Sequence, residues 1–302
     1  MELIKNTKID FIGKRYYAFV FSAALALTGI VAATLIPLGK ANLGIDFTGG
    51  VAIQLKFEKP FALERARKVL DGADFKDAEL QEFASGNQLL IRLKNTEGVL
   101  KTTSDKLTEV FAKGFADNKF IVESTTAVGP TVGKKLQKDA LWAVSISLLG
   151  ILIYVAWRFE LIFGIAAVIA TFHDVLAVLG IFYLLNREIN LLIITALLTL
   201  AGYSLTDTVV VFDRIRENLR KRGREALEDL INRSINEVLS RTIVTSSTVL
   251  IVLLALLIAG GEVIHDFSLA LFLGVLVGTY SSIFVASPLL LLWKGKRGRL
   301  IR

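Results

Sequence analysis

Six long runs of hydrophobic residues stand out along the chain, and each is about as long as a membrane-spanning helix. A helix needs roughly 20 mostly apolar residues to cross about 30 Å of hydrocarbon. Four of the runs contain no formal charge, and the other two contain one carboxylate each. The expected transmembrane helices are 18–38, 140–157, 161–185, 189–212, 242–261 and 267–293. This pattern predicts a polytopic α-helical membrane protein with six transmembrane helices.

A more polar stretch, residues 39–139, separates the first run from the second and predicts a small folded domain. It holds 30 charged residues between Lys40 and Asp139. Alternating apolar positions predict strands, and apolar positions at helical spacing predict helices. The expected elements are strand 51–57, helix 61–70, a hairpin of strands 81–84 and 89–93, helix 100–115 and strand 120–125. This order is that of an α+β, ferredoxin-like domain.

Basic residues near the ends of the runs predict the orientation of the helices, because loops rich in Lys and Arg stay in the cytoplasm. Four basic residues lie in the N-terminal segment 1–17, eight in 213–241 and five in the tail 294–302. The two short loops expected on the other side hold one and none. We therefore expect both termini in the cytoplasm and the α+β domain outside. The first run is too long for a signal peptide and lacks a cleavage motif, so we expect it to be retained.

The composition narrows the chemistry that the chain can support. It has no cysteine, which excludes disulfides, thiolate metal sites and a cysteine nucleophile, and only two histidines. The net charge of +7 would suit nucleic acid, but most of the basic excess lies in the segments expected in the cytoplasm. We expect no cofactor, no resident metal and no nucleic-acid partner.

Two glycine-bearing segments of the polar stretch resemble nucleotide-binding loops only in part. Residues 129–135 have three rather than four residues between the glycines, and no Ser or Thr follows the lysine. We interpret them as an extended hinge before the second helix. Residues 43–50 are interpreted as turn glycines at the entry to a strand.

Asp207, in the fourth run, is one of two carboxylates that interrupt the apolar runs. A charge near the bilayer centre costs at least about 2.5 kcal/mol, so such a carboxylate is a candidate functional group. Thr195, Thr199 and Tyr203 precede Asp207 at four-residue spacing and share its helix face. The fourth helix therefore carries a polar stripe.

Arg241 lies just before the fifth run, at the expected cytoplasmic edge, and is the expected partner of Asp207. Thr245 and Thr248 follow it on the same helix face. A carboxylate beside a guanidinium changes its pKa when the two separate, so the pair can act as a proton-operated switch. The alternative is a static bridge between two helices.

Other ionisable groups are weaker candidates. His173 and Asp174 lie near the middle of the third run, where they can relay protons or, equally well, fix packing against a helix or subunit. Asp213 and Arg214 lie at the expected water boundary, and we interpret them as residues that end the fourth helix.

Two further patterns concern packing. Apolar residues recur at helical spacing among the charged residues of 213–241, which predicts an amphipathic cytoplasmic helix on the headgroups or against a partner. In the sixth run, Gly274 and Gly278 form a GxxxG pair that permits close helix contact.

Residues Gly202–Asn218 and Ser234–Thr242 resemble the signature of the SecF branch of the SecD–SecF family of protein translocase subunits. Leu43–Gly50 and Ala127–Leu136 also resemble motifs of that family, and the resemblance covers essentially the whole chain. The family belongs to the resistance-nodulation-division superfamily, in which two six-helix halves form the working unit. The resemblance therefore implies that this chain is one half and needs a partner.

The resemblance also implies protein transport without chemical catalysis. SecF-like proteins pair with SecD in the bacterial inner membrane, associate with the SecYEG channel and often YajC, and use the proton gradient to move unfolded preprotein on the outer side. In the family, the residues matching Asp207 and Arg241 operate the proton pathway. The His-Asp pair matching His173 and Asp174 is typical of the family.

Two other functions fit the sequence less well. A small-molecule exporter of the same superfamily needs a drug-sized pocket, and an external domain of about 100 residues is too small to enclose one. A purely structural subunit has no reason to bear the cost of a midspan carboxylate. A carboxylate–arginine pair without a cluster of oxygen ligands favours protons over sodium as the coupling ion.

Overall fold

The chain folds into two compact units, which are described separately. The computed structural model describes residues 7–36, 38, 40–83, 86–94, 100–158, 160–221 and 223–293. The helical bundle comprises Met1–Asn42, Ala143–Arg187 and Leu192–Arg302. The α+β unit comprises Leu43–Trp142 and, from a distant part of the chain, Glu188–Leu191.

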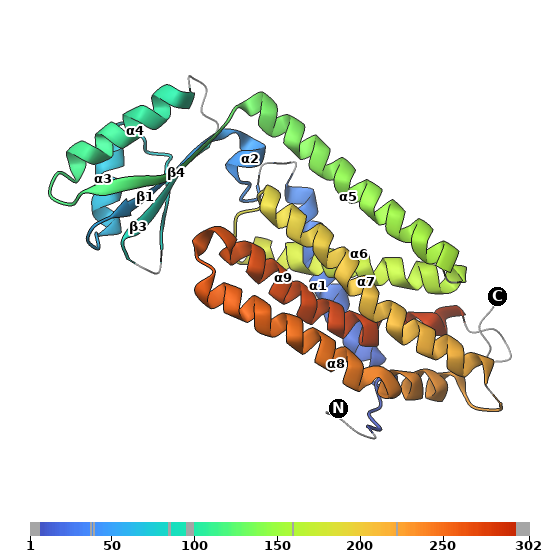
Figure 1. Ribbon diagram of the computed structural model, residues 1–302. Helices are drawn as coiled ribbons and strands as arrows, with labels where there is room; N and C mark the ends of the chain where they lie inside the picture. The colour runs from blue at the N-terminus through green and yellow to red at the C-terminus, as the bar shows by residue number, and fades with distance from the viewer. Residues whose placement is uncertain are drawn as a thin grey trace. The chain divides into compact units, whose positions relative to one another are not determined.

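The α+β unit confirms the predicted ferredoxin-like order. After a four-residue helix α2 (Ile45–Thr48), its elements are β1 (Gly50–Phe57), α3 (Leu63–Gly72), β2 (Glu79–Glu82), β3 (Gln88–Lys94), α4 (Leu100–Gly114) and β4 (Phe120–Val128). The strands form one antiparallel sheet in the order β2-β3-β1-β4. Helices α3 and α4 lie on the same face of this sheet (Figure 1).

The core of the α+β unit follows from strand periodicity. Successive side chains of a strand point to opposite faces, so Val51, Ile53 and Leu55 of β1 all face the helices and are buried. They pack with apolar residues of β3, α3 and α4, of which Phe111 is completely buried. The edge strand β4 differs, because its side chains from Ile121 to Ala127 are exposed on both faces.

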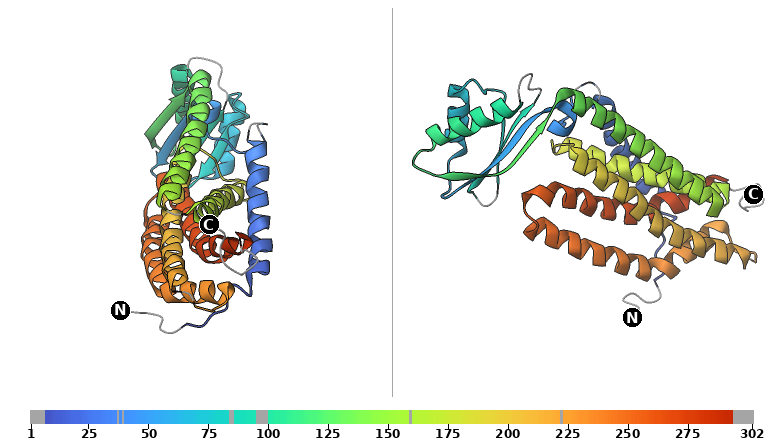
Figure 2. Two further views of the ribbon diagram at one scale, coloured as in Figure 1. Left: turned by 90° about the vertical axis from the view of Figure 1, so that its right-hand side faces the viewer. Right: turned by 45° about the horizontal axis from the view of Figure 1, so that its top comes forward.

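Within the described residues, six helices are long and apolar enough to cross a membrane, which confirms the predicted fold class. They belong to the bundle, except that residues 130–142 and Leu191 are part of the α+β unit. They are α1 (Arg15–Leu35), α5 (Pro130–Arg158), α6 (Leu161–Leu184), α7 (Leu191–Arg220), α8 (Leu227–Ala259) and a sixth segment that starts with α9 (Glu262–Ser281). This last segment continues through a π-helical turn (Ser282–Ala286), α10 (Ser287–Leu289) and a 3₁₀ turn (Leu290–Trp293). Helices α8 and α9 run side by side (Figure 2).

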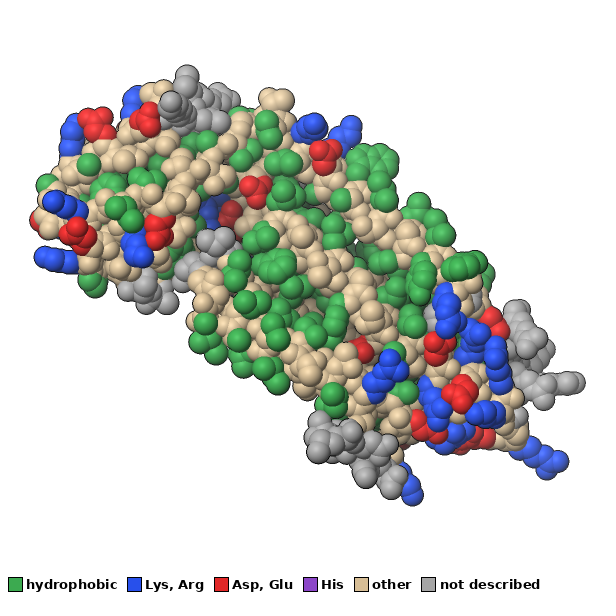
Figure 3. All heavy atoms as spheres, viewed as in Figure 1, with side chains coloured by type: hydrophobic (Ala, Val, Ile, Leu, Met, Phe, Trp, Pro, Cys, Tyr) green, Lys and Arg blue, Asp and Glu red, His purple; other side chains and the backbone are tan. Residues whose placement is uncertain are grey.

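The surface of the bundle separates apolar from charged side chains. Hydrophobic side chains cover much of its visible face, and Lys and Arg gather at the end where α7 meets α8 (Figure 3). On α5, Leu141, Ile146, Leu149 and Ile153 are all exposed. Such a surface suits contact with lipid or with another membrane helix.

Several helices extend beyond the apolar runs that predicted them. The interpretation of residues 129–135 as an extended hinge is wrong, because α5 begins at Pro130. Proline is favoured at the first helical position, where its missing N–H is not needed. Helix α7 continues to Arg220, so Asp213 and Arg214 lie inside it and do not end it.

The predicted amphipathic segment 213–241 is not a separate surface helix. Its second part is the start of α8, which runs without a break into the apolar run. Leu230, Ile231 and Ile235 are completely buried in the core of the bundle, not turned toward headgroups or a partner. The predicted helical spacing is therefore confirmed, but other parts of the same chain cover the apolar face of this helix.

Glycines allow the closest helix crossings of the bundle. A Cβ atom at Gly29 of α1 would lie 2.1 Å from the backbone oxygen of Leu176 on α6, and one at Gly180 would lie 2.6 Å from the backbone N of Gly29. The GxxxG pair serves the same purpose within the chain, since Cβ atoms at Gly274 and Gly278 would meet residues of α7. Small residues at such crossings are how membrane helices gain packing contacts.

We expect Gly29→Ala to lower the thermal stability of the protein. The added methyl group would collide with backbone atoms of α6, and overpacking of this kind costs about 1–3 kcal/mol. The matched control is Gly150→Ala, because a Cβ atom at that position of α5 meets nothing within 4 Å. Unfolding in detergent, followed by loss of the monodisperse peak on heating, compares the two. Equal midpoints of thermal unfolding for both variants would refute a close crossing of α1 and α6 at Gly29.

Candidate functional site

Asp207 lies inside the bundle, where side chains of three helices meet. It belongs to α7 and is only 4% exposed. The Ser246 hydroxyl of α8 donates a hydrogen bond of 3.3 Å to its carboxylate. The same hydroxyl shares a hydrogen bond of 2.6 Å with Thr279 of α9. The carboxylate therefore heads a short chain of hydroxyl groups, an arrangement in which a proton can be taken up or released.

The structure does not pair Asp207 with Arg241. No ion pair joins these two described residues: Arg241 is exposed on α8, and its charge acts on the Asp207 carboxylate only through a longer-range Coulombic attraction. Thr245 is exposed on the same face and donates to the Arg241 carbonyl oxygen at 2.9 Å. The face of α8 that meets Asp207 is the one with buried Thr242 and Ser246. Arg241 thus begins the same helical turn as the contact residues but lies on its outer side.

The polar stripe on α7 runs from the surface of the bundle to its interior. Thr195 and Thr199 are exposed, Tyr203 is half-buried and Asp207 is buried. The Thr199 hydroxyl donates to the carbonyl oxygen of Thr195 at 2.8 Å. Exposed hydroxyl groups on a membrane helix are typical of a surface that another protein or water contacts.

Asp174 forms a second polar cluster, which ties three helices together. It lies on α6 and is completely buried. Ser204 of α7 and Ser281 of α9 both donate to its Oδ2 atom, the latter at 2.7 Å. The Nδ1 atom of neighbouring His173 lies 2.9 Å from its Oδ1 atom. A carboxylate that accepts from side chains of α7 and α9 is well placed to fix the packing of α6.

Some polar atoms in this part of the bundle are buried without a hydrogen-bond partner among the described residues. Leaving such an atom unpaired costs about 1–3 kcal/mol, so each one calls for an explanation. They include His173 Nε2, the Tyr203 hydroxyl, Thr208 Oγ1 and Thr242 Oγ1. Tyr203 and Thr208 belong to α7 and lie near Asp207 in the sequence. The interior around Asp207 therefore contains more polar groups than its packing needs.

Asp213 and Arg214 are held by ion pairs at the charged end of the bundle. Arg158, the last residue of α5, lies 3.2 Å from Asp213. Arg214 lies 2.6 Å from both Glu217 of α7 and Glu237 of α8. These residues fasten α7 to its neighbours, and neither contacts Asp207.

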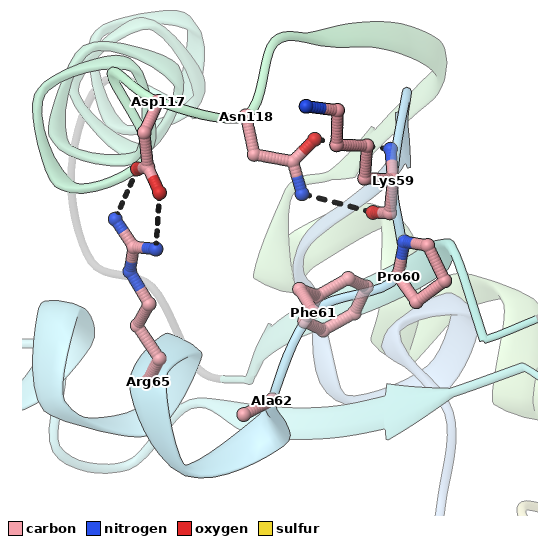
Figure 4. A pocket seen from close by; sticks show the side chains of 7 residues that line it. All are labelled: Lys59, Pro60, Phe61, Ala62, Arg65, Asp117 and Asn118. Carbon is pink, nitrogen blue, oxygen red and sulfur yellow. Dashed lines mark hydrogen bonds and ion pairs between the residues drawn. The ribbon is translucent and has the colours of Figure 1, made fainter.

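A shallow pocket of about 300 Å³ lies on the α+β unit (Figure 4). Two of its lining groups are already paired: Arg65 donates to Asp117, and Asn118 exchanges hydrogen bonds of 3.0 and 2.8 Å with the Lys59 backbone. The hydrogen bonds from Arg65 lower the pKa of Asp117 to about 2. The pocket is therefore a consequence of how α3 meets the loop after α4. Its polar groups stabilise that contact.

The sequence alone missed four hydroxyl residues that complete the two clusters. Ser246 and Thr279 contact the Asp207 cluster, and Ser204 and Ser281 contact Asp174. The spacing of Ser204, three residues before Asp207 on α7, would have associated it with Asp207, whereas its partner in the structure is Asp174. Within the described residues, no three His, Asp or Glu side chains gather as a metal site would require.

Comparisons with known proteins show a consistent relationship. A family model described as "Protein export membrane protein SecD/SecF, C-terminal" matches residues 108–296, and one described as "SecD/SecF GG Motif" matches residues 40–61. The chain is 53% identical over 294 residues to "Protein translocase subunit SecF" of Thermodesulfovibrio yellowstonii, with 97% of each chain covered. It is 46% identical over 307 residues to the protein of the same name in Calditerrivibrio nitroreducens, with 99% of each covered.

Among solved structures, the chain resembles the crystal structure of SecDF, a translocon-associated membrane protein from Thermus thermophilus. The TM-score is 0.83 and the sequence identity 39%. The match covers 97% of this chain and 40% of the other, so the chain spans about two fifths of the length of that SecDF protein.

Proposed function

The chain belongs to the SecF family of protein translocase subunits, and from this membership we propose that it uses a proton gradient, together with a SecD chain, to assist preprotein export through the SecYEG channel. In this proposal it lies in the bacterial inner membrane with both termini in the cytoplasm, and YajC is a further partner. The observation that carries the proposal is the buried carboxylate of Asp207 with its hydroxyl contacts on α8 and α9.

Asp207 is the proposed proton-carrying group. A carboxylate inside a membrane helix is costly, and its presence is explained by a task that needs its titration. The hydroxyl groups of Ser246 and Thr279 can follow its protonation by reorienting, because a hydroxyl can both donate and accept. In this proposal the change in charge on Asp207 alters how α7 packs against α8 and α9. No bond of a substrate is made or broken, so the activity is transport.

Arg241 is proposed to act on Asp207 from the outer face of α8 in only part of the transport cycle. In this structure it makes no ion pair with Asp207, and its side chain is exposed. Thr195 and Thr199 of α7 and Thr245 of α8 are also exposed, and the Thr199 and Thr245 hydroxyls donate to carbonyl oxygens of their own helices. The charge of Arg241 would be unfavourable against lipid, so a SecD half covering it fits the arrangement.

Asp174 is proposed to be a packing residue and not a relay. Its carboxylate already accepts hydrogen bonds from side chains of two other helices, and His173 contacts it as well. Protonation would weaken all three contacts at once. A group that titrates in each transport cycle would repeatedly weaken the packing of α6, whereas a carboxylate that stays charged holds α6 in place.

The test of the proposed function uses vesicles that contain SecD, this chain and SecYEG. Export of a preprotein from a late translocation stage is measured with and without an imposed proton gradient. The proposal expects the gradient to accelerate this stage only when the chain is present. Equal export rates with and without the chain would refute the proposal. Stimulation by a sodium gradient in place of a proton gradient would show that sodium, not the proton, is the coupling ion.

The edge strand β4 is the proposed contact for unfolded preprotein. Its backbone is unpaired on one side of the sheet, and Ile121 and Val122 are exposed. An extended polypeptide can add to such an edge through backbone hydrogen bonds, which do not depend on sequence. The opposite edge, β2, is short and carries Glu79 and Glu82, features that discourage strand pairing.

We expect a single cysteine at Ile121 to form crosslinks with a stalled preprotein. The chain has no native cysteine, so the introduced one is the sole reactive thiol. Glu82→Cys on β2 is the matched control and is expected to give few or no adducts. Crosslinks from Ile121→Cys to SecD alone would contradict a preprotein contact at β4.

A further inference from the structure

The second half of the connection between α6 and α7 is fastened to the α+β unit, whereas Arg187 in its first half pairs with Asp266 of α9 at 3.1 Å. Residues Glu188–Leu191 cluster with the α+β unit, although they lie about 50 positions beyond its main segment. Ile189 and Leu43 form a parallel bridge, and the Gly44 N–H donates to the Ile189 carbonyl oxygen at 2.9 Å. At the start of α7, the Leu191 N–H donates to the carboxylate of Asp46 at 3.0 Å.

An ion pair between buried Glu188 and half-buried Arg92 strengthens this attachment. Glu188 is 8% exposed, and a nitrogen of the Arg92 guanidinium on β3 lies 2.8 Å from its carboxylate. Gly44 is required beside it, because a Cβ atom there would lie 2.3 Å from the Glu188 Oε1 atom. Burial raises the pKa of Glu188, and the positive charges of Arg92 and Lys94 oppose that rise, whereas Glu79 and Asp46 add to it.

The start of α5 contacts the same short segment. The Gln137 side chain donates to the Phe47 carbonyl oxygen at 3.1 Å. A Cβ atom at Gly133 would lie 2.8 Å from that oxygen, so α5 passes α2 as closely as backbones allow. Gly49 has φ of 75° and turns the chain between α2 and β1. We call residues 43–49 together with 188–191 the α2 junction.

We propose that the α2 junction is a rigid link within the α+β unit that fixes residues 188–191, and with them the start of α7, to that unit, with Glu188 and Arg92 as its positioning residues. This inference rests on the proposed function. Helix α6 carries Asp174 and α7 carries Asp207, so the connection between them is the shortest covalent route from either carboxylate to the α+β unit. Contiguous networks of packed and hydrogen-bonded groups of this kind carry coupling between distant sites.

Glu188→Arg tests the link by placing two positive charges together. We expect faster hydrogen–deuterium exchange in peptides that cover residues 188–191, and a loss of gradient-stimulated export of roughly 5–150-fold, the range of typical coupling energies. The double variant Glu188→Arg with Arg92→Glu restores the opposite charges and is expected to recover both. The matched control is Glu109→Arg, which disrupts an exposed pair with Lys113 on α4 and is expected to change neither.

A disulfide tests whether the link stays closed during transport. Neighbouring strands lie about 4.8 Å apart, within the Cα separation of roughly 4.4–6.8 Å that a disulfide spans. Leu43→Cys with Ile189→Cys therefore introduces a bridge into a chain without other cysteines. A rigid link predicts the same gradient-stimulated export in the oxidised and reduced protein. Loss of export on oxidation, regained on reduction, would show that the junction opens and would overturn the inference.

The two measurements separate this inference from the proposed function. If the gradient fails to stimulate export by the unaltered protein, the proposed function fails, while hydrogen exchange still reports whether Glu188 and Arg92 hold the junction. If Glu188→Arg leaves exchange at 188–191 unchanged, or if the charge-swapped double variant is as impaired as the single one, the inference fails alone.

Discussion

Asp207→Asn is expected to reduce gradient-stimulated export to the rate seen without a gradient, while the complex with SecD still assembles. The amide has nearly the shape of the carboxylate and can accept the hydrogen bond from Ser246, so the packing of α7 against α8 is kept. The amide cannot take up or release a proton in the physiological pH range, so position 207 no longer alternates between a charged and a neutral state. Export of a late translocation intermediate from vesicles, with and without a proton gradient, measures the effect.

The control for this variant is Asp139→Asn, the same chemical change at an exposed position of α5. It should leave gradient stimulation unchanged. Stimulation of the Asp207→Asn protein equal to that of the unaltered protein would show that Asp207 does not carry the proton. Failure of Asp207→Asn to assemble would show instead that the carboxylate is needed for folding, as in a static bridge.

The surroundings of Asp207 show how far sequence reasoning reaches into the site. The cost of a buried carboxylate identified the residue itself, and four-residue spacing identified the stripe above it on α7. Spacing on α8 does not say which face turns inward. Arg241, Thr245 and Thr248 share one face and Thr242 and Ser246 another, and both contain polar residues. The charge of Arg241 favoured the prediction that its own face contacts Asp207. In the structure, the face with Thr242 and Ser246 packs against Asp207 instead.

The fold was more predictable than the site, because each element has its own periodic signal. Apolar runs predicted the six helices, and alternation predicted all four strands to within a few residues. Helix ends were less accurate where the signal changes from a fully apolar run to an amphipathic one. Leu230 and Ile235 show why: their spacing is helical, but nothing in the sequence says that the core of the bundle covers them.

The α2 junction lay beyond the reach of sequence reasoning for a different reason. Glu188 is one of two charged residues in a short loop, where charges are ordinary, and Arg92 is one of many basic residues in the α+β unit. Only the tertiary structure joins positions nearly 100 residues apart into a largely buried pair. Gly49 and Gly50 have positive φ and turn the chain into β1, as the sequence predicts. The room that Gly44 leaves for Glu188 follows only from the tertiary structure.

Asp174→Ala is expected to destabilise the protein by about 3–5 kcal/mol, the cost of removing one partner from a buried, charged hydrogen-bonded cluster. The Ser204 and Ser281 hydroxyls and His173 would lose their common acceptor. Helix α6 would then lose its polar contacts with α7 and α9 at this level. Thermal unfolding in detergent, together with the yield of complex with SecD, measures the loss.

Asp174→Asn distinguishes a packing residue from a proton relay. Its amide oxygen still accepts from one or two of the three partners, so a fixed point would be weakened but kept. A packing role therefore predicts a moderate loss of stability and a normal ratio of export rates with and without the gradient in the complexes that assemble. A relay predicts the reverse, with stability preserved and the ratio reduced to one. The second result would place Asp174 beside Asp207 on the proton pathway and would refute the assignment made here.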